Sequence, residues 1–113
     1  METKELKPGT LKHLQEYITY KMKERGFEDE TLHERLLLLA EEVGELIHAS
    51  RRLSGMNVDQ RRENTEDIGE EITDVINMIF CVAIKFNLNV EKEYYKKEKI
   101  INKRFYQRTE KKV

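Results

Sequence analysis

The sequence predicts an all-α protein with a four-helix, bundle-like protomer that is completed by homo-oligomerisation. Apolar residues recur at helical spacing in four segments, and one proline and five glycines are the strongest helix breakers in the chain. The apolar faces of the two central segments are too wide for a thin monomer to bury, so we expect a dimer or tetramer. At 113 residues, the chain is expected to form one domain, residues 1–113.

Four helices are expected, at about residues 10–25, 30–53, 65–87 and 90–107. A polar loop follows the second helix, and the four arginines around this junction suit either a solvated charge run or a segment that grasps phosphate. These arginines are Arg51, Arg52, Arg61 and Arg62. The residues expected to cap or stop the helices are, in order, Thr10, Asp29 or Thr31, Gly55, Asn64 or Thr65, and Asn89.

Two short acidic stretches, AEEVGELI at residues 40–47 and GEEITDVI at residues 69–76, repeat one pattern. Each contains two carboxylates three residues apart, and these are Glu42 with Glu45 and Glu71 with Asp74. At about 100° per residue, both copies place the first acid within an apolar face and the second acid at its edge. If the two faces pack together, four carboxylates converge.

Converging carboxylates need compensation, because desolvating a charged group costs several kcal/mol. Arg35 and Lys85 lie a turn or more away, so no basic side chain is expected beside the acids. A cation between them satisfies the charges, and ligands that are all oxygen favour Mg2+ first, with Mn2+ or Ca2+ next. The alternative interpretation is that the acids are solvated edge residues of two amphipathic helices.

The composition narrows the class of protein further. Charged residues make up 38% of the chain and the net charge is -1, so the balance predicts neither a nucleic-acid binder nor a membrane binder. The single cysteine, Cys81, excludes an intramolecular disulfide and fits a reducing compartment. The polar start of the chain and the lack of a long apolar run favour a cytoplasmic protein.

The acidic runs LLAEEVGEL at residues 38–46 and EEITDV at residues 70–75 resemble the ExxE…ExxD signature of the MazG-like nucleotide pyrophosphohydrolases. These enzymes belong to the all-α NTP pyrophosphatase superfamily. The likeness covers about residues 10–106. It includes Arg25-Gly26-Phe27 upstream, and Lys99, Asn102, Arg104 and Phe105 near the end.

The resemblance implies Mg2+-dependent hydrolysis of a nucleoside triphosphate between its α and β phosphates, in a homodimer or homotetramer. It implies that Glu42, Glu45, Glu71 and Asp74 bind the metal. Glu41 and Glu45 are both candidates for positioning the attacking water. The candidate substrate-binding residues are Asn77, Lys99, Asn102 and Arg104. The chain has no tryptophan, which counts against the base pocket of the dCTP-preferring relatives.

Three other interpretations compete with this one. Phosphoribosyl-ATP pyrophosphohydrolase of histidine synthesis uses similar acidic helices and cleaves the same bond. A di-iron bundle is suggested by the Glu45-x-x-His48 spacing, although such sites need that element twice. A non-catalytic helical dimerisation or regulatory module has no use for four converging acids, so the intact quartet argues against it.

Overall fold

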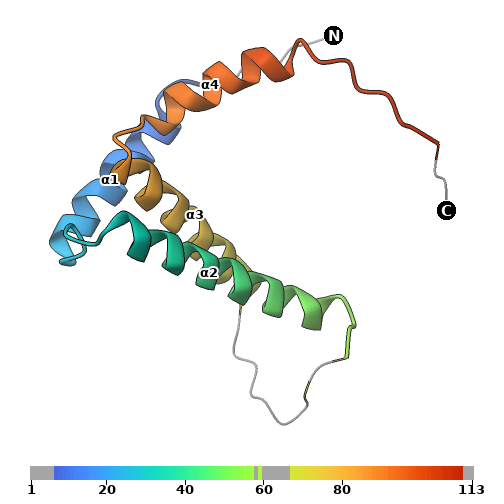
Figure 1. The fold of residues 1–113 in the computed structure, drawn as a ribbon, viewed down its shortest axis with the longest axis horizontal. Coiled ribbons are helices and arrows are strands. Elements are labelled where there is room, and N and C mark those ends of the chain that lie inside the picture. The colour runs from blue at the N-terminus through green and yellow to red at the C-terminus, as the bar shows by residue number, and fades with distance from the viewer. Residues whose placement is uncertain (1–6, 58, 60–66, 111–113) are drawn as a thin grey trace.

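The computed structural model describes residues 7–57, 59 and 67–110. This part of the chain contains four α-helices and no strand (Figure 1), which confirms the all-α prediction. No helix among the described residues is long and apolar enough to cross a membrane. The helices are α1 Thr10–Glu24, α2 Leu32–Leu53, α3 Ile68–Lys85 and α4 Val90–Ile101.

Helix α2 ends at Leu53 as predicted and begins two residues after the predicted start, with Thr31, one of the two predicted caps, before it. The Thr31 hydroxyl accepts a hydrogen bond from the backbone N–H of Glu34 over 3.1 Å, so Thr31 is the N-cap. At the other end Gly55 has a φ of 79°, a left-handed conformation that glycine adopts without strain. The N–H of Met56 then reaches back to the carbonyl of Arg51 over 3.2 Å, which closes the helix end.

The start of α1 differs from the prediction, because Thr10 is not its N-cap. The N-cap is Gly9, which has a φ of 100° and no side chain to offer the free N–H groups. Glu91 of α4 takes that role from 82 residues away. Its Oε1 accepts from the N–H of Gly9 over 2.8 Å and from that of Lys12 over 3.3 Å. A remote carboxylate therefore caps α1 and ties it to α4.

The start of α3 also differs from the prediction. Its N-cap is Asp67, whose Oδ1 accepts from the N–H groups of Gly69 over 2.7 Å and Glu70 over 3.2 Å. An aspartate at this position satisfies two of the free N–H groups of the first turn. The two residues predicted to cap α3, and two arginines of the predicted loop, lie outside the described residues. They are Asn64, Thr65, Arg61 and Arg62.

The last helix, α4, starts as predicted and ends early. The side chain of Asn89 accepts from the N–H of Lys92 over 3.0 Å, which confirms it as the N-cap. The helix stops at Ile101 rather than near Gln107. Phe105 is 89% exposed, so this part of the chain has no apolar surface to hold a further helical turn.

The four helices do not close into a bundle within one protomer. Helices α2 and α3 lie side by side, α1 packs on α3, and α4 packs on α1 and points away from the α2–α3 pair (Figure 1). The Cα radius of gyration is 18.2 Å, whereas a compact chain of this length has about 13 Å. The single chain is therefore an open arrangement.

The apolar faces of α2 and α3, which the sequence predicts to be too wide for one chain to bury, remain largely exposed in the single chain. The core cluster instead joins α1 to the opposite side of α3, through Ile18, Met22, Phe80 and Cys81. The exposed apolar face is formed by residues of α2 and α3 that are 36–56% exposed. These residues are Leu36, Val43, Ile47, Ile72, Ile76, Ile79 and Phe86.

Candidate functional site

Two contacts fix how α2 and α3 pair. Near the start of α2, the Arg35 Nη1 donates to the backbone oxygen of Cys81 on α3 over 2.8 Å. Seven residues further along α2 lies Glu42, and seven residues back along α3 lies Asp74. Glu42 and Asp74 are also brought together, so the antiparallel register is the same at both levels. Seven residues are about two helical turns, which keeps both contacts on one face of each helix.

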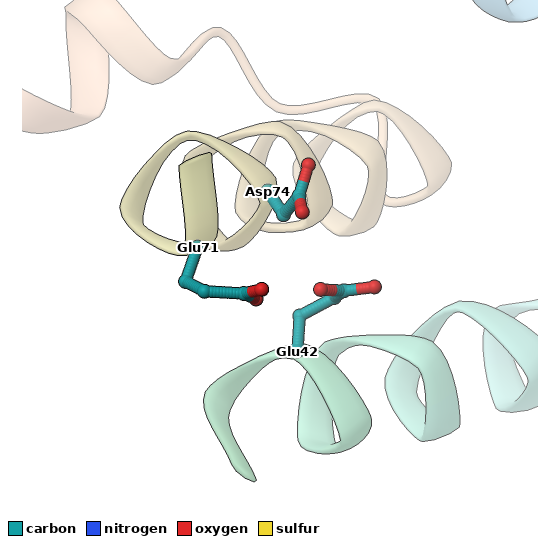
Figure 2. Close-up of side chains that lie close together, drawn as sticks. All are labelled: Glu42, Glu71 and Asp74. Atoms are coloured by element: carbon teal, nitrogen blue, oxygen red, sulfur yellow. The ribbon is translucent and has the colours of Figure 1, made fainter. Parts of the chain in front are cut away.

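Glu42, Glu71 and Asp74 form what we call the acidic cluster. One carboxylate oxygen from each of the three lies within 4.8 Å of the other two. Figure 2 shows Glu42 extending from α2 and Glu71 from α3 into the space between the helices, with Asp74 beside them. Glu42 and Glu71 are partly buried, whereas Asp74 is exposed. The predicted convergence of acids from both helices is therefore present for three residues.

The electrostatics of the acidic cluster are unfavourable without a cation. Burial raises the pKa of Glu42 above its ordinary value, and the negative charges of Asp74, Glu41 and Glu45 raise it further. No Lys or Arg in the described part of the chain forms an ion pair with Glu42 or Asp74. A bound cation removes both causes of the shift, because it replaces lost solvation and offsets the like charges.

The donor set suits a hard divalent cation. Mg2+ holds oxygen ligands at about 2.1 Å, so ligands on opposite sides of the ion are about 4.2 Å apart. The three carboxylate oxygens lie within 4.8 Å of one another, which is close to the spacing of ligands that share one ion. The cluster therefore fits Mg2+, with coordination positions left for water or phosphate oxygens.

A pocket of about 530 Å3 opens beside the acidic cluster, and we call it the cluster pocket. Glu42 and Asp74 form part of its wall, and α1 forms much of the rest. Its remaining lining combines cationic, aromatic, polar and apolar side chains. These are Leu14, Tyr17, Ile18, Lys21, Met22, Arg25, Phe27, Thr73, Asn77, Met78 and Cys81.

Other predicted site residues are distributed unevenly around the cluster. Asn77 lines the cluster pocket together with Glu42 and Asp74. Glu41 and Glu45 are exposed on α2, and neither belongs to the group of carboxylates that can share one ion. That group, searched over the described residues, contains no histidine, so it gives the Glu45-x-x-His48 interpretation no support.

The C-terminal substrate-binding candidates lie elsewhere in the protomer. Lys99 is in the last turn of α4, Asn102 is its C-cap and Arg104 follows the helix. Among the described helices α4 makes its main contact with α1, and none of these three residues lines the cluster pocket. A single chain therefore does not bring them to the acidic cluster.

Three pocket residues were not singled out as a group from the sequence. Tyr17, Lys21 and Arg25 recur every four residues along α1, so they share one helical face. The ammonium of Lys21 lies 5.8 Å from the ring centre of Tyr17 and forms an ion pair with Glu24 over 3.0 Å. The four-residue spacing indicates that these side chains share a helical face, but the sequence does not show that this face lines a pocket together with Glu42.

Arg35 was also missed as a structural residue, although it is only 2% exposed. Besides Cys81, its guanidinium donates to the backbone oxygens of Phe27 over 3.4 Å and Glu28 over 3.3 Å. Burying a charge costs several kcal/mol, and hydrogen bonds to charged groups offset about 1.5–3 kcal/mol each. Three carbonyls from two segments thus hold one buried charge.

No protein-family model and no curated protein matches this chain.

Proposed function

We propose that this protein is a MazG-like, Mg2+-dependent nucleoside triphosphate pyrophosphohydrolase. It cleaves a nucleoside triphosphate between the α and β phosphates, so that one water is consumed and a monophosphate and pyrophosphate are formed. The observation that carries the proposal is the acidic cluster, with three carboxylate oxygens within 4.8 Å of one another. The cluster forms part of the wall of a pocket with cationic and aromatic side chains, and this pocket is the proposed substrate site.

The acidic cluster selects the charge of its ligand. A triphosphate is strongly anionic, so bare carboxylates repel it and a metal complex of it is the form they accept. Glu42, Glu71 and Asp74 hold Mg2+ in this proposal, and Mn2+ is the expected substitute. When bound, the ion supplies Lewis-acid stabilisation of the charge that develops on the phosphate oxygens.

The cationic side chains of the cluster pocket complement the phosphates. Lys21 and Arg25 line the pocket that Glu42 and Asp74 also line. Arginine makes bidentate contacts with phosphate oxygens, and lysine acts as a point charge. Both side chains therefore orient the phosphate groups that the acidic cluster alone would repel.

The same pocket contains groups suited to the nucleoside. Tyr17 and Phe27 are 55% and 49% exposed, so each has ring surface left for contact with a base. Aromatic rings stack favourably at an offset or edge to face. Asn77 offers an amide that both donates and accepts hydrogen bonds, so it suits a base edge or a sugar hydroxyl.

The attacking water needs a group that orients it and accepts its proton. Glu41 and Glu45 flank Glu42 on α2 and are exposed to solvent. Either carboxylate can accept a proton from a water held at the mouth of the site. We assign the orientation and deprotonation of the water to one of these two residues. Turnover by Glu41→Gln and by Glu45→Gln distinguishes them.

The assembly is proposed to be a homodimer or a homotetramer. The exposed apolar face of α2 and α3 is the surface on which a second copy packs. Such a face on an open protomer favours oligomerisation, because burying apolar surface drives association.

Pyrophosphate release by matched variants tests the site. Glu42→Gln and Glu71→Gln keep side-chain size and remove one charge, so we expect loss of turnover with unchanged helical circular dichroism. Glu70→Gln is the control, because Glu70 is adjacent to Glu71, exposed and outside the acidic cluster. Full activity in either cluster variant contradicts the proposed site.

A further inference from the structure

Arg35 is a buried, hydrogen-bonded arginine that has no role in the proposed hydrolysis. Its side chain is almost completely buried, and its guanidinium donates three hydrogen bonds to backbone carbonyls. Within the described residues it forms no ion pair with a carboxylate. A buried arginine that is held by carbonyls alone links segments of backbone instead of neutralising an acid.

The segments that Arg35 links are the ones that define the α2–α3 pairing. Two of its hydrogen bonds reach Phe27 and Glu28 in the turn before α2, and the third reaches Cys81 on α3. The planar guanidinium presents its donors in a fixed fork, so both directions are set at once. Sliding α2 along α3 breaks the contact with Cys81.

The distance from this clamp to the acidic cluster is set by helix geometry. Arg35 and Glu42 are seven residues apart on α2, and Asp74 and Cys81 are seven residues apart on α3. Both intervals span about 10 Å. The register that joins Arg35 to Cys81 is thus the register that places Glu42 against Asp74.

We infer that Arg35 is the positioning residue of the acidic cluster: it sets the α2–α3 register that makes Glu42, Glu71 and Asp74 a metal site. It acts through backbone and does not touch the substrate. For its consequence in metal binding, this inference rests on the proposed function, while the register itself is measurable without any metal.

A pair of spin labels measures the register directly. His33→Cys and Glu70→Cys, in a Cys81→Ala background, place labels on exposed positions near the starts of antiparallel α2 and α3. The shared register separates these positions by about 20 Å along the helix axes. Isothermal titration with Mg2+, without nucleotide and without labels, gives the affinity of the site.

The test variant is Arg35→Met and its matched control is Ala49→Gly. Ala49 is 3% exposed and lies seven residues after Glu42, as Arg35 lies seven residues before it. Ala49→Gly therefore changes a buried position of the same helix, at the same distance from the cluster, without removing a side-chain hydrogen bond. We expect Arg35→Met to shift or broaden the label distance and to weaken Mg2+ binding by about tenfold or more. We expect Ala49→Gly to change neither.

The other possible results contradict either the role of Arg35 or the proposed function. An unchanged, sharp label distance in Arg35→Met overturns the inference, and so does an equal change in Ala49→Gly. If Arg35→Met does not fold, Arg35→Lys keeps the charge but lacks the planar fork that bonds both segments at once. An unchanged label distance in that variant also overturns the inference. A wild-type protein that binds no Mg2+ contradicts the proposed function, while the label distances still decide the role of Arg35 in the register.

Discussion

Glu42 and Asp74 face each other from antiparallel helices, with carboxylate oxygens within 4.8 Å. Burial is the largest cause that raises the pKa of Glu42, and the charge of Asp74 is the next. Two acids held this close raise the energy of the folded protein unless a cation lies between them.

The raised pKa of Glu42 predicts a pH dependence with a definite sign. Its folded-state pKa lies above the ordinary value of 4.5, so the folded state binds a proton here more tightly than the unfolded state. The metal-free protein therefore loses stability as pH rises through that pKa. Mg2+ needs the carboxylate, so its affinity falls as pH drops through the same range, above 4.5.

Substitution of Glu41 checks the cause of this shift. The charge of Glu41 is one of those that raise the pKa of Glu42, so Glu41→Gln moves the midpoint of Mg2+ binding to lower pH. Isothermal titration across pH measures the midpoint without any turnover. A midpoint that moves upward, or does not move, contradicts the electrostatic account of the cluster.

The caps of α2 and α1 predict unequal effects of the same substitution. Thr31→Ala removes the hydroxyl that accepts from Glu34 and is expected to cost about 1 kcal/mol in the free energy of unfolding. Thr10 is a helical residue that caps nothing, so Thr10→Ala is expected to change it by less than about 0.5 kcal/mol. Urea unfolding measures both, and equal losses would show that Thr31 is not the working cap.

The contact of Glu91 with α1 predicts how α4 is attached. Glu91→Ala removes the acceptor for Gly9 and Lys12, with an expected cost of about 1.5 kcal/mol and faster amide exchange at both residues. Glu93→Ala also removes an acid from the first turn of α4, but Glu93 is exposed, so it serves as the control. Similar amide exchange rates at Gly9 and Lys12 in the two variants would contradict the proposed attachment of α4 to α1 through Glu91.

The exposed apolar face predicts an oligomer that one charge disrupts. Ile76 is 41% exposed near the middle of α3, and Ile76→Lys is expected to shift the molar mass from a dimer or tetramer towards the monomer. Light scattering after size exclusion measures this. Leu88→Lys is the control, because Leu88 is 43% exposed but lies in the turn before α4. A monomeric wild-type protein contradicts the proposed assembly.

Much of the local structure was predictable because it depends on neighbouring residues. Thr31, Gly55 and Asn89 satisfy helix ends within a few residues of themselves, and the sequence pattern indicated all three, Thr31 as one of two alternatives. The matching phase of the two acidic stretches also anticipated that acids from α2 and α3 meet. Contacts of this kind follow from helix geometry alone.

The buried faces were less predictable, because apolar periodicity identifies a face without identifying what covers it. Val43 and Ile76 belong to the apolar faces that the sequence indicates, and both are exposed in the single chain. Arg35 is buried instead, since its donors find backbone carbonyls that only the tertiary structure brings near. The cap supplied by Glu91 is equally remote, because 82 residues separate it from Gly9.

Pyrophosphate release from a panel of canonical and modified nucleoside triphosphates, with Mg2+ and with EDTA, tests the proposed hydrolysis. The panel includes phosphoribosyl-ATP, and ion chromatography measures pyrophosphate and monophosphate together. We predict equal amounts of both products from at least one nucleoside triphosphate with Mg2+, and none with EDTA. Release of orthophosphate, release that persists in EDTA, or no release from any nucleoside triphosphate would contradict the proposed activity.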